Sequence, residues 1–498
     1  MQRHISVIAL LIVFFIAGSF STSIQKSKLQ QRFEQFAADT TLSNANWSLH
    51  VANAVTGQTI LSHNSRQAVV PASTQKIVTT ATALLILGSD FRYPTTLTHT
   101  GMIDQDGILH GDLVIKGSGD PTLGAVQLHD SLALERVFDH WLKDLRRLGI
   151  RQLTGNILAD ESVFDDEMVP RKWLWEDIGN YYGAGSSGLT VHENMYTVFF
   201  QPGSAAGEPV RVLGTEPLIP GMVLENLVTT GPRGSGDQVY IFGAPYNNHR
   251  VLTGTAPLGA NRFPVRGSMP DPPAYLAAQF DAFLSQHGIN TSGQTLTFRQ
   301  AMQVNYPIVT RTEAISTWWS PPLKDIAIRT NLNSNNTYAE NLLKTIGYHR
   351  SGLGSVRSGA EALMAFWHDL GVPLQGMRLH DGSGLSPSNR LTTAQLTAIL
   401  AYCAQHPVFH DFVEGLPVAG SSGSLENHFR GTPSQGVLKA KSGFLGNVRA
   451  YAGYTSLQDG SLATFAFIVN DYHGSPAVMR EKMFRLMDAI TAHDHSKP

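Results

Sequence analysis

Residues 71–78 read Pro71-Ala72-Ser73-Thr74-Gln75-Lys76-Ile77-Val78 and lead into a run with apolar residues at helical spacing. A serine thus stands three residues before a lysine at the start of a predicted helix, where residues i and i+3 share a face. A serine hydroxyl is a weak nucleophile until a base removes its proton, and a desolvated lysine can be that base. Serine is also a good helix N-cap, but a capping box needs Glu or Gln where this chain has Lys76. Ser73 and Lys76 are therefore a candidate nucleophile and its base.

Two later triplets strengthen this hypothesis. Ser334-Asn335-Asn336 is an S-x-N triplet before a predicted helix, and Lys441-Ser442-Gly443 is a K-[S/T]-G triplet before a predicted strand. Each is weak alone, since Ser23–Lys26 is a second S-x-x-K and Ser62–Asn64 a second S-x-N. The signal is the ordered set: S-x-x-K on a helix start, then S-x-N before a helix, then K-S-G leading into a strand.

This ordered set resembles the motifs of class A β-lactamases and penicillin-binding proteins. Ser334 lies 261 residues (334 − 73) after Ser73, about the length of a whole class A catalytic domain, so a large insertion separates the first two motifs. That arrangement is similar to the low-molecular-mass class C penicillin-binding proteins, the D-alanyl-D-alanine carboxypeptidase/endopeptidase family of the penicillin-binding protein 4 type. Three further segments share the likeness: 111–123, 381–386 and 416–420.

The resemblance implies an α/β fold: a penicillin-binding-protein/serine β-lactamase-like transpeptidase domain with a large β-rich insertion. Residues 91–314 are rich in glycine and proline and contain short runs of alternating apolar residues, so we expect the β-rich insertion there. Helices and strands at both chain ends then suggest one catalytic domain assembled from 24–90 and 315–498. A chain of 498 residues exceeds what one hydrophobic core usually holds, which agrees with several domains.

The resemblance also implies roles for these residues. Ser73 would attack the carbonyl between two D-alanines, and Lys76, with its pKa lowered by burial and a second cation, would take its proton. Ser334 would pass a proton to the leaving amine, and Asn336 would orient Lys76 and the substrate amide. Lys441 would be the second cation and would attract the substrate carboxylate.

The K-S-G segment is expected to bind substrate next to these groups. The Ser442 hydroxyl would help Lys441 hold the carboxylate, beside Gly443, and the backbone N–H groups of Ser73 and Phe444 would form the oxyanion hole. In relatives, an aspartate of the insertion and an arginine of the D-G-S-G-L-S-R segment bind the third residue of the stem peptide. Asp160 matches the aspartate, whereas Pro387 occupies the arginine position and Arg390 lies three residues on. A solvated loop acid is the competing interpretation of Asp160.

The N-terminus predicts export. Arg3 and His4 precede the largely apolar stretch 5–17, and small residues follow, which is the order of a secretory signal. Residues 1–20 are thus a predicted signal peptide or an N-terminal anchor, and the protein is expected to be periplasmic or secreted. Membrane association is expected only through an uncleaved N-terminus. With a net charge of −2 and no basic, aromatic-interleaved run, nucleic-acid binding is disfavoured.

Other chemistries find little support in the sequence. There is no G-x-S-x-G elbow and no H-E-x-x-H, and the single cysteine, Cys403, is interpreted as a buried small hydrophobe. We therefore expect no metal and no cofactor, and expect peptidoglycan stem peptides and β-lactams as partners. The alternatives are a catalytically silent envelope-binding relative, a β-lactamase, or a D-amino-acid esterase. The balance of carboxypeptidase and endopeptidase activity stays open.

Overall fold

A computed structural model describes residues 27–494 of the chain. The predicted signal peptide or anchor, residues 1–20, lies outside this range. Within it, no helix is both long and apolar enough to cross a membrane.

A five-stranded antiparallel sheet joins the two ends of the chain, in the order β19-β20-β21-β1-β2. Its strands are β1 (Asn46–Asn53), β2 (Thr59–His63), β19 (Lys439–Leu445), β20 (Val448–Ser456) and β21 (Leu462–Asn470). Side chains alternate between its faces. Phe465 and Phe467 pack toward α1 (Lys28–Ala37) and α12 (Pro476–Thr491), whereas Ala466 and Ile468 pack into the helical core of the other face.

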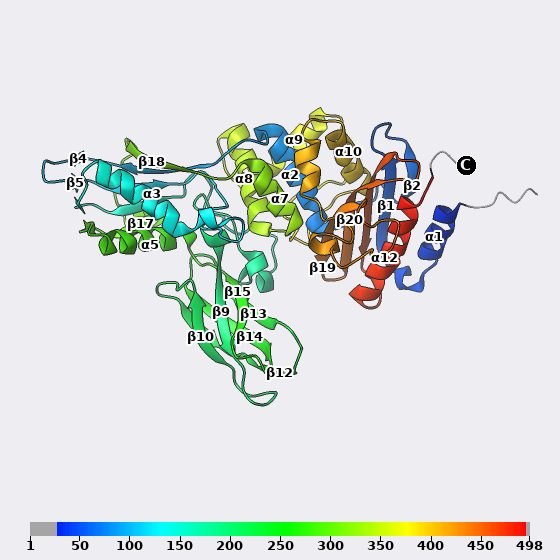
Figure 1. The fold of residues 1–498 in the computed structure, drawn as a ribbon, viewed down its shortest axis with the longest axis horizontal. Coiled ribbons are helices and arrows are strands. Elements are labelled where there is room, and N and C mark those ends of the chain that lie inside the picture. Colours follow the sequence, from blue (N-terminus) through cyan, green and yellow to red (C-terminus); the bar gives the residue numbers. More distant parts are fainter. Residues whose placement is uncertain (1–26, 495–498) are drawn as a thin grey trace, which may run out of the picture.

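A group of helices covers that other face and lies between the sheet and the inserted part of the chain (Figure 1). They are α2 (Lys76–Leu87), α7 (Leu323–Leu332), α8 (Asn336–Ser351), α9 (Val356–Asp369), α10 (Thr393–Ala404) and α11 (Phe409–Glu414). The first nine residues of α2 are buried, so this helix is surrounded on all sides. Cys403 of α10 is buried in the same core.

A second five-stranded sheet, ordered β17-β8-β6-β3-β18, forms the first part of the insertion. Its strands are β3 (Pro94–His99), β6 (Leu113–Lys116), β8 (Ile157–Asp160), β17 (Thr295–Thr297) and β18 (Glu313–Trp319). The chain leaves the helices through β3 and returns through β18, and these two strands pair antiparallel. A small sheet lies at the far end, made of β4 (Met102–Ile103), β5 (Ile108–His110), β7 (Gln152–Leu153) and β16 (Asn290–Thr291).

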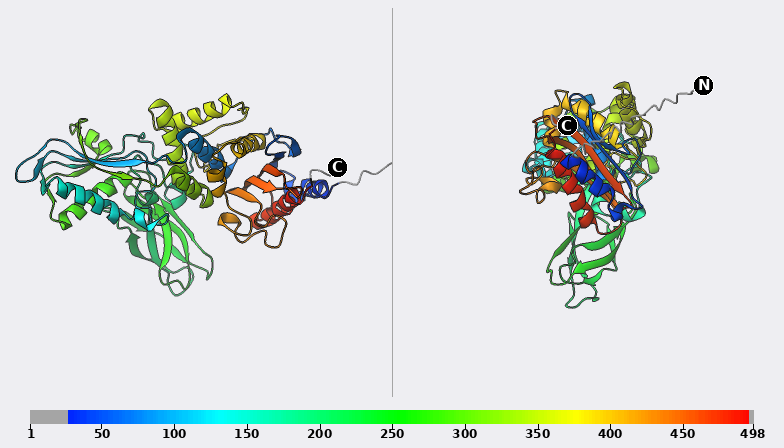
Figure 2. Two further views of the ribbon diagram at one scale, coloured as in Figure 1. Left: turned by 45° about the horizontal axis from the view of Figure 1, so that its top comes forward. Right: turned by 90° about the vertical axis from the view of Figure 1, so that its right-hand side faces the viewer.

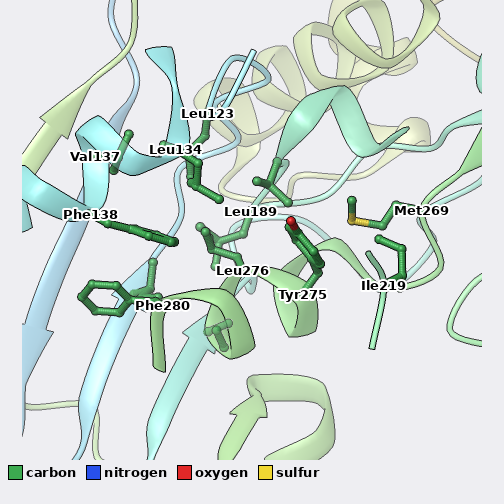
Figure 3. Close-up of a cluster of buried hydrophobic side chains, with 14 of the residues drawn as sticks. Leu123, Leu134, Val137, Phe138, Leu189, Ile219, Met269, Tyr275, Leu276 and Phe280 are labelled. Atoms are coloured by element: carbon green, nitrogen blue, oxygen red, sulfur yellow. The ribbon is translucent and has the colours of Figure 1, made fainter. Parts of the chain in front are cut away.

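Two helices that the β-rich interpretation of 91–314 missed pack on this second sheet: α3 (Leu134–Arg147) and α5 (Pro272–Gln286). Their facing side chains, Phe138 from α3 and Leu276 and Phe280 from α5, form a buried cluster (Figure 3). The helix α5 begins at the N-cap Asp271, whose side chain accepts from the Ala274 N–H. The insertion is thus a mixed α/β structure whose strands outweigh its helices.

The rest of the insertion is a β lobe that projects away from the long axis of the molecule (Figures 1 and 2). One of its sheets contains β9 (Met195–Gln201), β10 (Arg211–Glu216) and β15 (Phe263–Ser268); the other contains β11 (Val223–Asn226), β12 (Thr229–Gly231), β13 (Gln238–Phe242) and β14 (His249–Pro257). The short helices α4 (Trp175–Ile178) and α6 (Phe298–Gln303) complete the insertion's α-helices in the described residues.

Candidate active site

Ser73 lies on a short 3₁₀ turn, Ala72–Gln75, that continues directly into α2, whose first residue is Lys76. In a 3₁₀ turn residues i and i+3 lie one above the other, which places the two side chains together. Lys76 Nζ is 3.0 Å from Ser73 Oγ. Ala72, immediately before the serine, has φ +45°, a left-handed conformation unusual for a residue other than glycine and frequent at functional sites.

The Lys76 side chain is fully buried and meets two further oxygens. Its Nζ donates to Asn336 Oδ1 at 2.6 Å and to the Ser383 carbonyl at 2.8 Å. A neutral amine has two N–H donors and one lone pair. Since an amide oxygen and a carbonyl can only accept, they take both donors, which leaves the lone pair for the proton of Ser73.

Burial lowers the pKa of Lys76 to about 7, against the opposing influence of the acids Asp381 and Glu340. The neutral form of the Lys76 amine is therefore available near neutral pH. This side chain can act as a general base toward the Ser73 hydroxyl.

Ser334 and Asn336 come from the turn between α7 and α8. Ser334 has φ +57°, and Asn335 is the N-cap of α8, its side chain accepting from the Tyr338 N–H. Asn336 Nδ2 donates to the Tyr182 carbonyl at 2.7 Å. Because that contact requires the NH₂ group, it directs Oδ1 of the same amide to Lys76.

Lys441 reaches this turn from the sheet. It lies on β19, is buried, and its Nζ donates to Ser334 Oγ at 2.9 Å and to the Ser442 carbonyl at 2.9 Å. Burial and the nearby cation of Lys76 lower the pKa of Lys441 well below its usual range. Two neighbouring buried lysines disfavour each other's protonation, because like charges repel. A substrate carboxylate bound at Lys441 would favour the protonated form of Lys441, while Lys76 stays neutral.

The remaining predicted residues of the K-S-G segment lie along the edge strand β19. Ser442 Oγ donates to Ser424 Oγ at 2.7 Å. A Cβ on Gly443 would lie 2.9 Å from the Pro71 carbonyl and 3.0 Å from the Ser73 nitrogen, so only glycine lets the strand approach the serine turn. Phe444 is 55% exposed, with the Arg449 guanidinium 4.3 Å above its ring.

Two buried acids support Lys76 and were not predicted as site residues. Glu340 on α8 accepts from the backbone N–H groups of Gly382 and Ser383. Asp381 accepts from the Trp173 indole at 2.9 Å, as well as from Gly384 and Asn389. Burial, reinforced by the charge of Asp381, raises the pKa of Glu340 to about 8. Together they hold the 381–386 segment so that the Ser383 carbonyl faces Lys76.

The groups that surround Lys76 differ in how far the sequence could have indicated them. Glu340 is four residues after Asn336 and so shares its helical face, which the sequence could have indicated. Asp381 lies in a segment that already resembled the family. The carbonyls of Tyr182 and Ser383 carry no side-chain signal.

Asp160 forms no hydrogen bond or ion pair with the other predicted residues in the part of the chain that the structure describes. It ends β8 and is buried, and its Oδ1 accepts from the Ser162 N–H at 3.0 Å and from the Ser162 hydroxyl at 2.5 Å. Arg390, the nearest arginine after Pro387, donates from Nη1 to the carbonyls of Pro387 and Asn389. No group of three or more His, Cys, Asp or Glu in residues 27–494 could hold a metal ion.

Comparison with known proteins points to one family. The D-Ala-D-Ala carboxypeptidase 3 (S13) family matches residues 29–493. The chain is 30% identical over 462 residues to a D-alanyl-D-alanine carboxypeptidase of Actinomadura sp. (strain R39), covering 91% of this chain and 82% of that protein. It is 25% identical to the D-alanyl-D-alanine carboxypeptidase DacB of Haemophilus influenzae, covering 95% and 94%.

Among solved structures, penicillin binding protein 4 (dacB) from Haemophilus influenzae has the same fold. The TM-score is 0.78 at 21% identity, and the match covers 94% of this chain and 100% of the other. A second structure of that protein, complexed with a β-lactam, matches with a TM-score of 0.72 at 21% identity. These matches confirm the predicted fold class, and the family match confirms the resemblance inferred from the motifs. The chain belongs to the D-Ala-D-Ala carboxypeptidase 3 (S13) family and is a serine-type D-Ala-D-Ala carboxypeptidase, a hydrolase.

Proposed function

We propose that Ser73 is the nucleophile of this carboxypeptidase and Lys76 its general base. The observation that carries the proposal is the set of three contacts of Lys76 Nζ, two with obligate acceptors and one with Ser73 Oγ. Lys76 takes the hydroxyl proton as Ser73 Oγ attacks the carbonyl carbon between the two D-alanines. The backbone N–H groups of Ser73 and Phe444 stabilise the resulting oxyanion.

Collapse of the intermediate breaks the peptide bond and needs a proton on the leaving amine. Ser334 is the relay for that proton, and its hydrogen bond to Lys441 supports the role. Lys441, with the Ser442 hydroxyl, binds the free carboxylate of the terminal D-alanine. Water then attacks the acyl carbon while Lys76 takes a proton from it, and the same base gives that proton to Ser73 Oγ as the acyl–oxygen bond breaks, which releases the shortened peptide and regenerates the enzyme.

The substrate is the stem peptide of peptidoglycan, and penicillin acylates the same serine. A β-lactam-complexed relative of the same fold supports the second statement. We also propose export to the periplasm or the medium, which the N-terminal pattern supports and which would bring the enzyme to this substrate. Endopeptidase activity on cross-links uses the same atoms, with a longer leaving group.

For the domains we propose the predicted division: a catalytic domain of 24–90 and 315–498, and an insertion of 91–314. The sheet assembled from both chain ends supports the division, whereas the pairing of β3 with β18 extends the insertion's sheet to Trp319, a few residues past the predicted boundary. Asp160 is the candidate to bind a cationic third residue of the stem peptide, because its Oδ2 accepts no hydrogen bond from the described residues.

Incubation with benzylpenicillin tests the site assignment. Intact-protein mass spectrometry should show one added drug mass, on the peptide that contains Ser73. Ser73→Ala should lose the label while keeping its melting temperature. Labelling that survives in Ser73→Ala, or that falls on Ser334, would reject Ser73. D-alanine release from a pentapeptide measures carboxypeptidase activity, and chromatographic detection of monomers released from a cross-linked dimer measures endopeptidase activity. Turnover in either assay would exclude the catalytically silent binding relative.

A further inference from the structure

A groove of about 510 Å³ lies where the insertion returns to the helical part of the chain, apart from the residues of the catalytic site. Two consecutive tryptophans at the end of β18, Trp318 and Trp319, line it. Trp319 is 56% exposed, which is unusual for so large an apolar side chain. An exposed indole in a groove is a binding platform, because it offers a large rigid face with little conformational freedom to lose.

The rim of the groove is polar and balanced in charge. Arg92 and Asp325 lie on it, with His129 and Ser131. Neither Arg92 nor Asp325 forms an ion pair within residues 27–494; Arg92 Nη1 donates to the Ser320 carbonyl at 2.7 Å. The groove therefore combines an aromatic face with donors and acceptors that carry no large net charge.

This combination fits a sugar ring better than a peptide or an anionic polymer. A pyranose has a face of C–H groups, which packs on an indole, and an edge of hydroxyl and acetamido groups, which hydrogen-bond to polar side chains. A strongly anionic ligand would need an excess of cations, and a lining with one arginine and one aspartate, Arg92 and Asp325, does not supply it.

The helix α7 connects this groove to the catalytic site. Asp325 and Ile328 of α7 line the groove, and the helix ends at Leu332, two residues before Ser334 (Figure 1). Asp325 and Leu332 are seven residues apart in α7, or about 10 Å along the helix axis, and Ser334 follows in the turn after the helix. A polar chain also links the two places: Arg329 of α7 donates to Gln127, next to the groove, and to Glu193, which accepts from Asn335 beside Ser334.

The stem peptide is about as long as the helix α7. The scissile bond of a pentapeptide stem lies four residues from the sugar that carries it, and four extended residues span about 13–14 Å, whereas the ten residues of α7 span about 15 Å. We propose that the groove at Trp318 and Trp319 binds the glycan strand of peptidoglycan while its stem peptide reaches Ser73. This rests on the proposed function, since only then does the substrate carry a sugar. The sugar would contribute binding energy and so raise kcat/KM, although the groove does not contact the reacting atoms.

Two substrates and three variants test the proposal. The substrates are a free pentapeptide ending in D-Ala-D-Ala and the same pentapeptide on an N-acetylglucosaminyl-N-acetylmuramyl disaccharide. The variants are Trp319→Ala, Trp319→Phe and, as a matched control, Trp175→Ala, because Trp175 is 57% exposed and does not line the groove. Benzylpenicillin acylation and the melting temperature check that each variant is folded.

Wild type and Trp175→Ala should favour the disaccharide substrate about 10-fold in kcat/KM, in line with the binding energy of one stacked ring. Trp319→Ala should treat both substrates alike, and Trp319→Phe should keep part of the preference. A peptide-free glycan tetrasaccharide, titrated by calorimetry, should bind wild type and Trp175→Ala but not Trp319→Ala.

An equal preference in wild type and Trp319→Ala, or equal tetrasaccharide binding, would overturn the groove assignment. If neither the wild type nor any variant cleaves either substrate, the proposed function fails, and the tetrasaccharide titration still tests the groove. Loss of the preference in Trp175→Ala to the same extent would also count against the groove, because it would show a general effect of removing a surface indole.

Discussion

Lys76 and Asn336 are 260 residues apart in the chain, yet Lys76 Nζ donates to Asn336 Oδ1 at 2.6 Å. The lysine begins α2 and the asparagine begins α8, and both side chains project from the first turn of their helix. The other end of the same amide is held by the Tyr182 carbonyl of the insertion. Through these two hydrogen bonds, the side chain of Asn336 in the helical part of the chain links Lys76 to Tyr182 in the insertion.

The pH dependence of acylation follows from the pKa of Lys76, about 7. The neutral amine is the active form, so the second-order rate of penicillin acylation should rise as the pH rises through 7. The neutral fraction grows from about a tenth at pH 6 to about nine-tenths at pH 8. Stopped-flow or quench measurements over pH 5.5–8.5 would check this. A rate that is flat over that range would contradict a base with this pKa.

Replacement of Lys76 by arginine should remove the base and keep the positive charge, because arginine stays protonated in proteins. Lys76→Arg should acylate about 10² to 10⁴ times more slowly than wild type at pH 7.5, the usual contribution of a general base. Lys324→Arg, at the start of α7, is a control for the same exchange elsewhere in the chain. Acylation of Lys76→Arg at the wild-type rate would rule out the base role.

Gly443→Ala should disturb the serine without unfolding the sheet. The added methyl would meet the Pro71 carbonyl and the Ser73 nitrogen, both backbone atoms that cannot rotate away. A displacement of about 1 Å at a reacting group costs up to about 100-fold in rate, and these contacts require a shift of a few tenths of an ångström, so acylation should fall by about 3- to 10-fold.

Gly460→Ala provides the opposite control for this experiment. Gly460 has φ +81° in the hairpin between β20 and β21, with open space around it. Its replacement should lower the free energy of unfolding by about 1–2 kcal/mol through backbone strain while leaving acylation unchanged. The same loss of acylation in both variants would show that Gly443 acts only through stability.

The strands and helices near the chain ends were predictable because their periodicities are clean. Asp459-Gly460 is a typical hairpin turn between two apolar runs, and it joins β20 to β21 in the structure, while regularly spaced apolar residues form the buried face of α12. Ser73 differs slightly: it lies on a 3₁₀ turn, and the α-helix begins only at Lys76. The contact between residues i and i+3 forms in a 3₁₀ turn as well as in an α-helix, so Ser73 and Lys76 are still within hydrogen-bonding distance.

The insertion was harder to predict, for two physical reasons. Its many glycines and prolines favour a prediction of short strands and turns. The helix α3 nevertheless has a regular buried stripe, which includes Val137, Trp141 and Leu145. The helix α5 is buried along much of its length and mixes alanine with aromatic residues, so its stripe is less distinct. At the site, S-x-x-K, S-x-N and K-S-G were visible because side chains carry them, whereas the carbonyls of Tyr182 and Ser383 can be supplied by any residue.

Specificity for the third residue of the stem peptide gives the last prediction. Asp160 Oδ1 is occupied by Ser162, and its Oδ2 is the oxygen that would pair with a cationic substrate side chain. Asp160→Asn keeps an acceptor for Ser162 and removes only the charge. It should slow hydrolysis of a D-Ala-D-Ala peptide with a cationic third residue several-fold, and spare both the neutral analogue and penicillin acylation.

The partner expected from the resemblance is absent, because Pro387 replaces the arginine and Arg390 binds the carbonyls of its own turn. Recognition of a carboxylate on that third residue should therefore be weak, and peptides with lysine there should be cleaved about as well as those with diaminopimelate. Steady-state D-alanine release from these two peptides and the neutral analogue would measure both effects. Ser162→Ala is the structural control, since it removes the local contact and leaves the charge. If Ser162→Ala slows all three peptides while Asp160→Asn slows none selectively, the aspartate shapes the end of β8 and takes no part in substrate choice.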